Sequence, residues 1–166
     1  MIFTDLAAGD AVFLDANTFV YHFAPDPVLG GACRDLLVRI KSQTIAGFTS
    51  THVVSEMAHR LMTLEAMKAH GWPAAGIAQR LRNNPAAVRK LAAFRQAIQE
   101  IPRFGVQILA IPPGLLDAAA AVSQATGLLT NDGLVVAVMQ ANGLTGLASN
   151  DADFDRVPGV TRYGPA

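Results

Sequence analysis

The sequence is poor in cysteine and lacks any long apolar run. Cys33 is the only cysteine among 166 residues, so no pair exists for an internal disulfide. No apolar run approaches the roughly 20 residues that a membrane-spanning helix needs. The first five residues, Met-Ile-Phe-Thr-Asp, also lack the basic start and apolar centre of a secretory signal. We therefore expect a cytoplasmic protein that does not associate with a membrane.

The sequence also has no net charge, with 13 Lys and Arg against 13 Asp and Glu. A neutral chain is not expected to coat nucleic acid by bulk electrostatics. The charge is uneven, however, because the predicted basic helical segment at about 74–104 has one acid, Glu100. Its basic residues are Arg80, Arg82, Arg89, Lys90, Arg95 and Arg103. The segment is either a solvated helical face or a surface for nucleic acid or a partner. If the segment binds nucleic acid, the candidates for contacting its phosphates are Arg80, Arg82, Arg89 and Lys90.

Short apolar runs alternate with helical patterns along the chain. This alternation predicts an α/β fold with a short, mostly parallel sheet and helices on both faces. The length suits a single domain over 1–166, since domains are most often about 100–150 residues long. The predicted strands are 11–14, 45–48, 105–111 and 144–148, with an edge strand within 157–163. The predicted helices are 28–41, about 51–70, 74–82, 86–101, 115–126 and a last one that Asn142 and Gly143 end. The hydroxyls of Thr49, Ser50 and Thr51 are potential caps for the helix up to about His70, and Thr130 or Asn131 for the last helix.

Four carboxylates follow the predicted strands or begin the predicted helices. Asp15 and Asp151 follow the first and fourth main strands, and Glu56 and Asp132 lie within two turns of helix starts. Because parallel strands end at one rim, all four are expected to converge there. Each also has a simpler explanation. Asp15 is a potential helix cap, Glu56 a solvated helix residue and Asp132 a favourable charge in a first turn.

Glu56 is free to face a site because it lies off the apolar stripe of its helix. The stripe is about 140° away on a helical wheel. His52 and His59 share this flank and raise a zinc alternative, but the spacing is not the His-Glu-x-x-His of zinc proteases. The apolar stripe is Val53, Val54, Met57, Ala58, Leu61 and Met62.

Four carboxylates in one small pocket repel one another unless a cation is present. Oxygen ligands select hard ions such as Mg²⁺ or Mn²⁺, which activate water and neutralise phosphate oxygens. The pattern thus favours hydrolysis of a phosphodiester.

Receiver domains and haloacid-dehalogenase-type phosphatases also place an aspartate after the first strand. They need a lysine late in the chain, whereas the last lysine here is Lys90.

Four stretches together resemble PIN-domain nucleases, most nearly the VapC-type toxins of type II toxin–antitoxin systems. The resemblance implies a three-layer α/β/α fold and a Mg²⁺- or Mn²⁺-dependent endoribonuclease. It also implies that the substrate is RNA, that the protein forms a homodimer, as such toxins often do, and that a cognate antitoxin inhibits it. The stretches are Phe-Leu-Asp-Ala-Asn at 13–17, Ser-Glu at 55–56, Thr-Asn-Asp at 130–132 and Ser-Asn-Asp-Ala-Asp-Phe at 149–154.

By position, the resemblance assigns Asp15, Glu56, Asp132 and Asp151 as the catalytic, metal-binding quartet. It makes Asp153 an auxiliary acid and Asn17 and Ser149 polar supports.

Two features depart from the family. Ser149 stands where threonine is commoner, and the basic segment lengthens the chain beyond the compact toxins. That extra segment puts the usual dimer geometry and antitoxin groove in doubt. Asp155 is expected to be a surface residue. The alternatives are a non-catalytic module that binds RNA or a partner, and a nuclease that acts on DNA.

Overall fold

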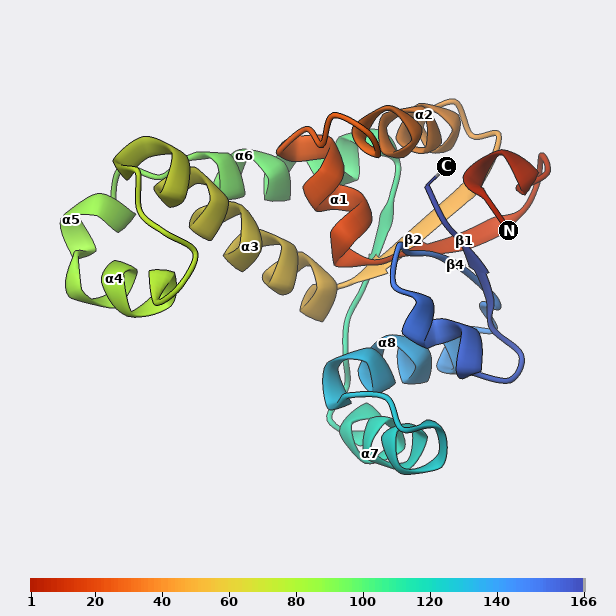
Figure 1. Ribbon diagram of the computed structural model, residues 1–166. Coiled ribbons are helices and arrows are strands. Elements are labelled where there is room, and N and C mark those ends of the chain that lie inside the picture. The colour runs from red at the N-terminus through yellow and green to blue at the C-terminus, as the bar shows by residue number, and fades with distance from the viewer. Residues whose placement is uncertain (166) are drawn as a thin grey trace.

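The computed structural model describes residues 1–165, whose centre is a five-stranded sheet with the order β3-β2-β1-β4-β5 (Figure 1). Every neighbouring pair of strands is parallel. This confirms the predicted parallel sheet, although two of the predicted strands are shorter than expected. The strands are β1 (Ala11–Leu14), β2 (Ala46–Ser50), β3 (Gln107–Leu109), β4 (Gly146–Ala148) and β5 (Thr161–Tyr163).

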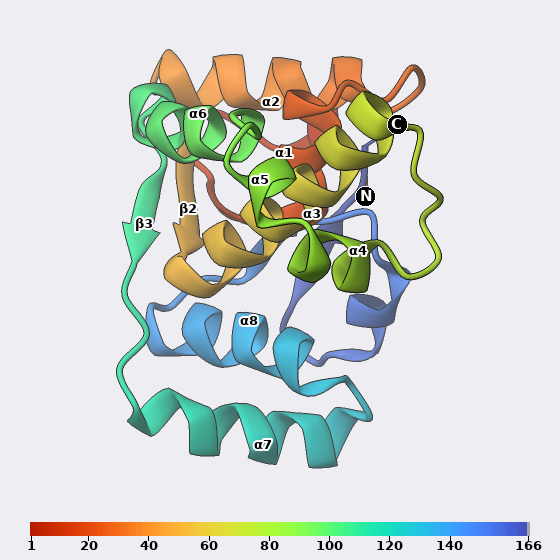
Figure 2. The same ribbon diagram turned by 90° about the vertical axis from the view of Figure 1, so that its left-hand side faces the viewer.

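Helices cover both faces of the sheet, so the three-layer α/β/α architecture is confirmed. One layer contains α1 (Ala16–Phe23), α2 (Gly30–Lys41), α3 (Thr51–His70) and α6 (Ala93–Glu100) (Figure 1). The opposite layer contains α8 (Thr130–Ala141), with α7 (Gly114–Thr126) packed on its outer side (Figure 2). The remaining helices are α4 (Ile77–Asn83), α5 (Pro85–Val88) and the 3-10 turns η1 (Phe3–Asp5), η2 (Ile101–Phe104) and η3 (Ala152–Arg156).

Strand β1 lies at the middle of the sheet, where the strand order reverses. The chain crosses from β1 to β2 and β3 on one side, and then returns to place β4 on the other side. Phe13 therefore pairs with both Phe48 and Leu147. In open α/β sheets, the crevice beside such a reversal, at the carboxyl ends of the strands, is where ligands bind. The fold thus directs attention to the residues that follow β1 and β4.

The helix α1 was not predicted from the sequence. Its residues include valine, threonine and three aromatic rings, which are mediocre helix formers. Burial stabilises it instead, because Ala16, Phe19 and Val20 lie on one face at spacings of three and four and pack into the core. The capping of α3 by Ser50 does follow the prediction, since its hydroxyl accepts the Val53 N–H at 3.3 Å.

The prediction of one continuous helix over 86–101 was wrong. The chain turns between α5 and α6, and the Glu65 carboxylate on α3 accepts the backbone N–H groups of Ala92 and Ala93 at 3.1 and 3.0 Å. A side chain 27 residues away thus caps α6 and sets where it starts. The turn buries Leu91 in a small second core together with Leu81.

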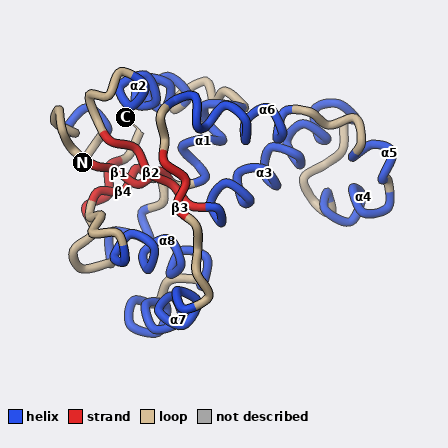
Figure 3. Tube along the Cα trace, turned by 180° about the vertical axis from the view of Figure 1, so that it is seen from behind, coloured by secondary structure: helices blue, strands red, loops and turns tan. Residues whose placement is uncertain are grey.

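Helices α4 and α5 form a lobe at the far end of α3, away from the sheet (Figure 3). We call residues 72–92 the basic lobe. Its core is separate from the main core, which surrounds the sheet. No helix in residues 1–165 combines the length and apolar character that crossing a membrane requires.

Candidate functional site

Asp15 is a buried carboxylate at the point where β1 passes into α1. It is 8% exposed, and its backbone N–H still pairs with Ala148 of β4 at 3.1 Å. One carboxylate oxygen accepts the Ala16 N–H at 2.6 Å. The other accepts the Asn17 amide at 2.5 Å and the Ser149 hydroxyl at 2.8 Å. Three donors therefore fix its orientation at the carboxyl end of the central strand.

Ser149 and Asn17 join the ends of β1 and β4. The Ser149 hydroxyl, besides donating to Asp15, accepts the Asn17 amide N–H and the Asp151 backbone N–H, both at 3.0 Å. The Asn17 carbonyl oxygen in turn accepts the Asn150 backbone N–H at 3.1 Å. The structure thus places both predicted polar supports against Asp15 and uses them to shape the chain that leads into Asp151.

Glu56 and Asp132 approach from the two helical layers. Both are half-buried, one turn into α3 and in the first turn of α8. Neither Thr130 nor Asn131 caps α8 as predicted, because its cap residue is Leu129 and makes no side-chain bond.

The carboxylates lie within electrostatic reach of one another. Burial raises the pKa of Asp15 to about 6 against the hydrogen bonds from Ser149 and Ala16, and the charges of Glu56 and Asp132 add to the rise.

Asp132 is affected by an overlapping set of charges, with Glu56 common to both residues. Burial raises the pKa of Asp132, the negative charges of Asp151, Glu56 and Asp153 raise it further, and His52 opposes them. The four residues of the predicted quartet therefore share one electrostatic neighbourhood, with Asp153 at its edge.

The side chains of this neighbourhood do not converge into a preformed metal cage. Among residues 1–165, no three Asp, Glu, His or Cys side chains lie close enough together to hold one ion. The donor set is nevertheless chemically suited to a hard divalent cation, because it offers carboxylate oxygens whose mutual repulsion a cation would relieve. Asp15 is held by three hydrogen-bond donors, and the side chains that would join it around an ion are Glu56, Asp132 and Asp151.

Two arginines hold the acidic loop that follows β4. Arg156 pairs with Asp153 and donates to the Gly127 carbonyl at 3.4 Å, which ties the loop to the segment before α8. Arg162 forms two bonds of 2.8 Å to Asp155 and donates to the Ser149 carbonyl at 3.2 Å.

These contacts change the interpretation of the loop. The Asp153 carboxylate already pairs with Arg156, and Asp155 is exposed, as expected, and in addition pairs with Arg162. Sequence reasoning missed both arginines, although Arg156 lies three residues after Asp153, a spacing that brings two side chains together on a helical turn. Arg162 lies seven residues beyond the acid that it pairs with, on the edge strand β5.

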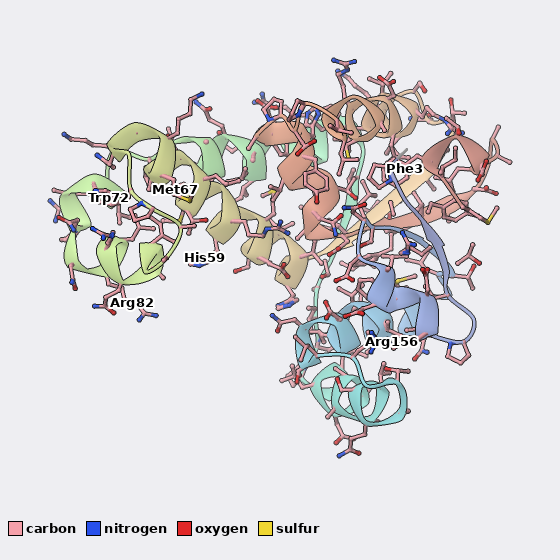
Figure 4. All side chains as sticks on the ribbon, in the orientation of Figure 1. Phe3, His59, Met67, Trp72, Arg82 and Arg156 are labelled. Atoms are coloured by element: carbon pink, nitrogen blue, oxygen red, sulfur yellow. The ribbon has the colours of Figure 1, made fainter. Side chains whose placement is uncertain are left out.

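The basic residues predicted to contact substrate lie apart from the carboxylates. Arg80 and Arg82 are on α4, and Arg89 and Lys90 occupy the turn after α5, all in the basic lobe. In Figure 4, Arg82 and His59 extend from the same side of the arm formed by α3 and the lobe. That arm and the α7–α8 layer diverge from the sheet, and the first turns of α1, α3 and α8 meet at the corner between them (Figure 1).

An open hollow of about 340 Å³ lies beside the acids. It is lined by side chains from α1, α3 and the loop after β4. The Asn150 amide spans part of its wall by donating to the Tyr21 hydroxyl at 3.3 Å. The lining residues are Asn17, Tyr21, Arg60, Asn150, Asp151 and Ala152.

The family model for the PIN domain matches residues 12–160, so the chain belongs to the PIN-domain family. No curated protein matches the sequence significantly.

Several solved structures share the fold at low identity. VapBC2 from Rickettsia felis, solved with a promoter DNA fragment, is 16% identical, with a TM-score of 0.56 over 93% of this chain and 98% of that one. VapC20 from Mycobacterium tuberculosis, described as a toxin that cleaves the sarcin-ricin loop, is 19% identical, with a TM-score of 0.57 over 87% and 92%. A toxin–antitoxin complex from Klebsiella pneumoniae is 18% identical, with a TM-score of 0.51 over 90% and 95%.

Proposed function

We propose that the protein is a cytoplasmic, Mg²⁺- or Mn²⁺-dependent endoribonuclease, acting as the toxin of a toxin–antitoxin pair. The observation that supports it most is the buried carboxylate of Asp15. Ser149 and Asn17 donate hydrogen bonds to it, and the charges of Glu56 and Asp132 raise its pKa. A PIN-domain family match supports the nuclease class. The toxin assignment draws on the similarity to VapC20 and to toxin–antitoxin complexes.

In this proposal, Asp15, Asp132 and Asp151 bind the ion, and Glu56 binds it or orients the attacking water. A bound Mg²⁺ or Mn²⁺ would activate that water and neutralise charge on the phosphate. Ser149 and Asn17 keep the Asp15 carboxylate in one orientation, so that little reorganisation is needed when substrate binds. Asp153 is an auxiliary acid that Arg156 restrains.

The surfaces outside the acids suit a polyanionic substrate and a protein partner. Arg80, Arg82, Arg89 and Lys90 of the basic lobe attract RNA phosphates at the end of α3 that is far from the carboxylates. A cognate antitoxin and a homodimer are the protein partners that we propose. Coexpression with the product of a short neighbouring gene, followed by co-purification, tests the antitoxin.

Cleavage of RNA by purified protein tests the function. With Mg²⁺ or Mn²⁺, wild type is expected to cut single-stranded or structured RNA, and Asp15→Asn is expected to lose at least about 100-fold in rate. Asp35→Asn, a change of one exposed carboxylate on α2, is the matched control and keeps full activity. RNA cleavage that is undiminished in Asp15→Asn would overturn the proposal.

Two further measurements decide the substrate and the cellular role. Matched RNA and DNA oligonucleotides differ at the 2′-hydroxyl, and preference for the DNA would overturn the RNA assignment. Expression of wild type is expected to arrest growth, whereas Asp15→Ala is not.

A further inference from the structure

The elements that supply the acids also supply a second set of side chains, which is not acidic. Tyr21 lies on α1, Arg60 on α3 and Asn150 next to Asp151. Arg60 follows Glu56 by four residues, so the two share one face of α3. Together with Asp151, these three side chains line the hollow of about 340 Å³. The hollow is therefore continuous with the acid neighbourhood through Asp151.

Arg60 is an uncommitted cation in this hollow. Within residues 1–165 its guanidinium forms no ion pair and donates no hydrogen bond, although the residue is half-buried. By contrast, Arg156 and Arg162, in and beyond the acidic loop, each pair with an aspartate. A guanidinium has five N–H donors and no acceptor, so a guanidinium without a protein partner can bind an anion that enters from solvent.

The other walls present neutral polar groups in a fixed arrangement. The Asn17 amide is committed to Asp15, Ser149 and the Asn150 backbone, which makes it a rigid part of the wall. The Tyr21 hydroxyl accepts from Asn150 and keeps its own proton to donate. These groups are complementary to a nucleotide. The cation suits its phosphate, and the phenolic hydroxyl and the amide suit its sugar hydroxyls and the polar edge of its base.

We propose that this hollow is a nucleotide subsite for the residue next to the cleaved bond of the RNA. Arg60 binds its phosphate with two parallel hydrogen bonds, and Tyr21 and Asn150 contact its sugar or base. This inference rests on the proposed ribonuclease function. It assigns to Arg60 the compensation of charge that a polyanion needs when it approaches several carboxylates. Because Arg60 lies on α3 between Glu56 and the basic lobe, it also places the RNA strand along that helix.

Binding of a labelled RNA tests the subsite without turnover. The probe is a fluorescein-labelled, eight-nucleotide single-stranded RNA of mixed sequence, and the host protein is Asp15→Asn. Adding Arg60→Gln is expected to weaken binding about tenfold at moderate salt. It is also expected to reduce the slope of log K against log salt by about 0.7, the amount expected for one phosphate contact to a single strand.

Three companion variants separate the subsite from a general structural effect. Arg60→Lys keeps the charge and so keeps the slope, but it binds more weakly because it loses the two parallel bonds. Tyr21→Phe and Asn150→Ala are expected to weaken binding about threefold without changing the slope. Arg34→Gln removes an exposed arginine of α2 and leaves affinity and slope as they were. Thermal melting of each variant reports whether it is folded.

The outcomes distinguish this inference from the proposed function. If wild type cleaves RNA and Asp15→Asn does not, while Arg60→Gln retains affinity and slope, the subsite is overturned and the ribonuclease stands. If wild type neither binds nor cleaves RNA, the ribonuclease itself is overturned. If Arg60→Lys loses as much affinity and as much salt slope as Arg60→Gln, then Arg60 acts through packing, and the phosphate contact is overturned.

Discussion

The hydroxyl of Ser149 donates to the carboxylate of Asp15 at 2.8 Å, across 134 residues of sequence. This bond joins the ends of β1 and β4 at the point where the strand order reverses. The backbone carbonyl of Ser149 accepts a hydrogen bond from the Arg162 guanidinium at 3.2 Å. The same residue thus connects the buried acid of the central strand to an exposed ion pair at the edge of the sheet.

Replacement of Ser149 by alanine should lower both stability and cleavage. Ser149→Ala removes the hydroxyl that donates to Asp15 and that accepts from Asn17 and Asp151. The Asp15 oxygen keeps the Asn17 amide as a donor, but it loses one of its hydrogen bonds, and the Asp151 N–H loses its acceptor. The loss of a hydrogen bond to a buried carboxylate costs about 1–3 kcal/mol in the free energy of unfolding. Ser149→Thr keeps the hydroxyl and should lie closer to wild type on both measures. Urea unfolding and RNA cleavage measure the effects, and an alanine variant as stable and active as wild type would contradict the expectation.

The Arg162 pair should matter more for the site than for stability. Its partner Asp155 is exposed, and the free energy from exposed ion pairs is small. Arg162→Met also frees the Ser149 carbonyl, so the loop before Asp151 loses one of its restraints. We expect a small change in melting temperature, slower cleavage and a higher Mg²⁺ concentration at half-maximal activity.

Asp155→Asn serves as the companion variant to Arg162→Met. It removes one charge of the pair but leaves the Arg162 bond to Ser149 in place. Its Mg²⁺ requirement should therefore stay near that of wild type. Equal shifts in the two variants would show that only the ion pair matters, and they would argue against a role for the carbonyl contact.

Asp132 should destabilise the metal-free protein. Burial and then the charges of Asp151, Glu56 and Asp153 raise its pKa, so ionising Asp132 costs more free energy in the folded protein than in the unfolded chain. In EDTA, Asp132→Asn is therefore expected to melt no lower than wild type. Adding Mg²⁺ should stabilise wild type, by about 2.7 kcal/mol at 100 times the dissociation constant, and should do little for the variant. A variant that melts several degrees lower in EDTA would instead make Asp132 a residue that stabilises the start of α8.

Much of the site follows from local patterns in the sequence. A short apolar run that ends in an acid gives both the strand and its position at the rim, as for Asp15 and Asp151. The position of Glu56 follows from helical periodicity, because the apolar stripe of α3 leaves it off the core. The helices α2, α3 and α7 begin and end close to the predicted residues for the same reason.

Other features depend on contacts between distant residues. The start of α6 is set by the Glu65 side chain, and α1 is stabilised by burial of Phe19 rather than by helix propensity. The role of Arg162 depends on a backbone carbonyl of another strand. No spacing or composition encodes the contacts of Glu65 and Arg162. The same holds for Arg60, whose lack of a partner is visible only in the folded chain.

Gly133, which follows Asp132, should be required for the packing of α7 on α8. A Cβ atom there would lie 2.4 Å from the Ser123 hydroxyl oxygen and 2.7 Å from the Ala119 carbonyl oxygen. The backbone oxygen has little room to move, so Gly133→Ala should cost about 1–3 kcal/mol in the free energy of unfolding. Gly31→Ala in α2 is the control, because its Cβ meets nothing within 4 Å and should be neutral or stabilising. Chemical denaturation measures both, and equal stabilities would contradict the close packing.

The stability of the metal-free protein should fall as pH rises from about 4 to 6. The pKa of Asp15 is about 6 in the folded protein and 3.8 ordinarily, so within this window the folded state binds more protons than the unfolded state. A rise in pH then favours unfolding, and the loss levels off above about pH 6. At about 1.4 kcal/mol per pH unit, the loss is at most about 3 kcal/mol.

Denaturation of wild type and Asp15→Asn in EDTA across this pH range isolates the contribution of Asp15. Asparagine does not titrate, so the variant should lack this part of the decline, and the difference between the two curves should grow from pH 4 to 6 and then stay constant. Asp132, whose pKa is also raised, titrates in both proteins and largely cancels in the difference. Saturating Mg²⁺ should abolish the decline in wild type, because a cation favours the ionised carboxylates. Parallel curves in EDTA would show that the Asp15 carboxylate is no harder to ionise in the folded protein than in the unfolded chain.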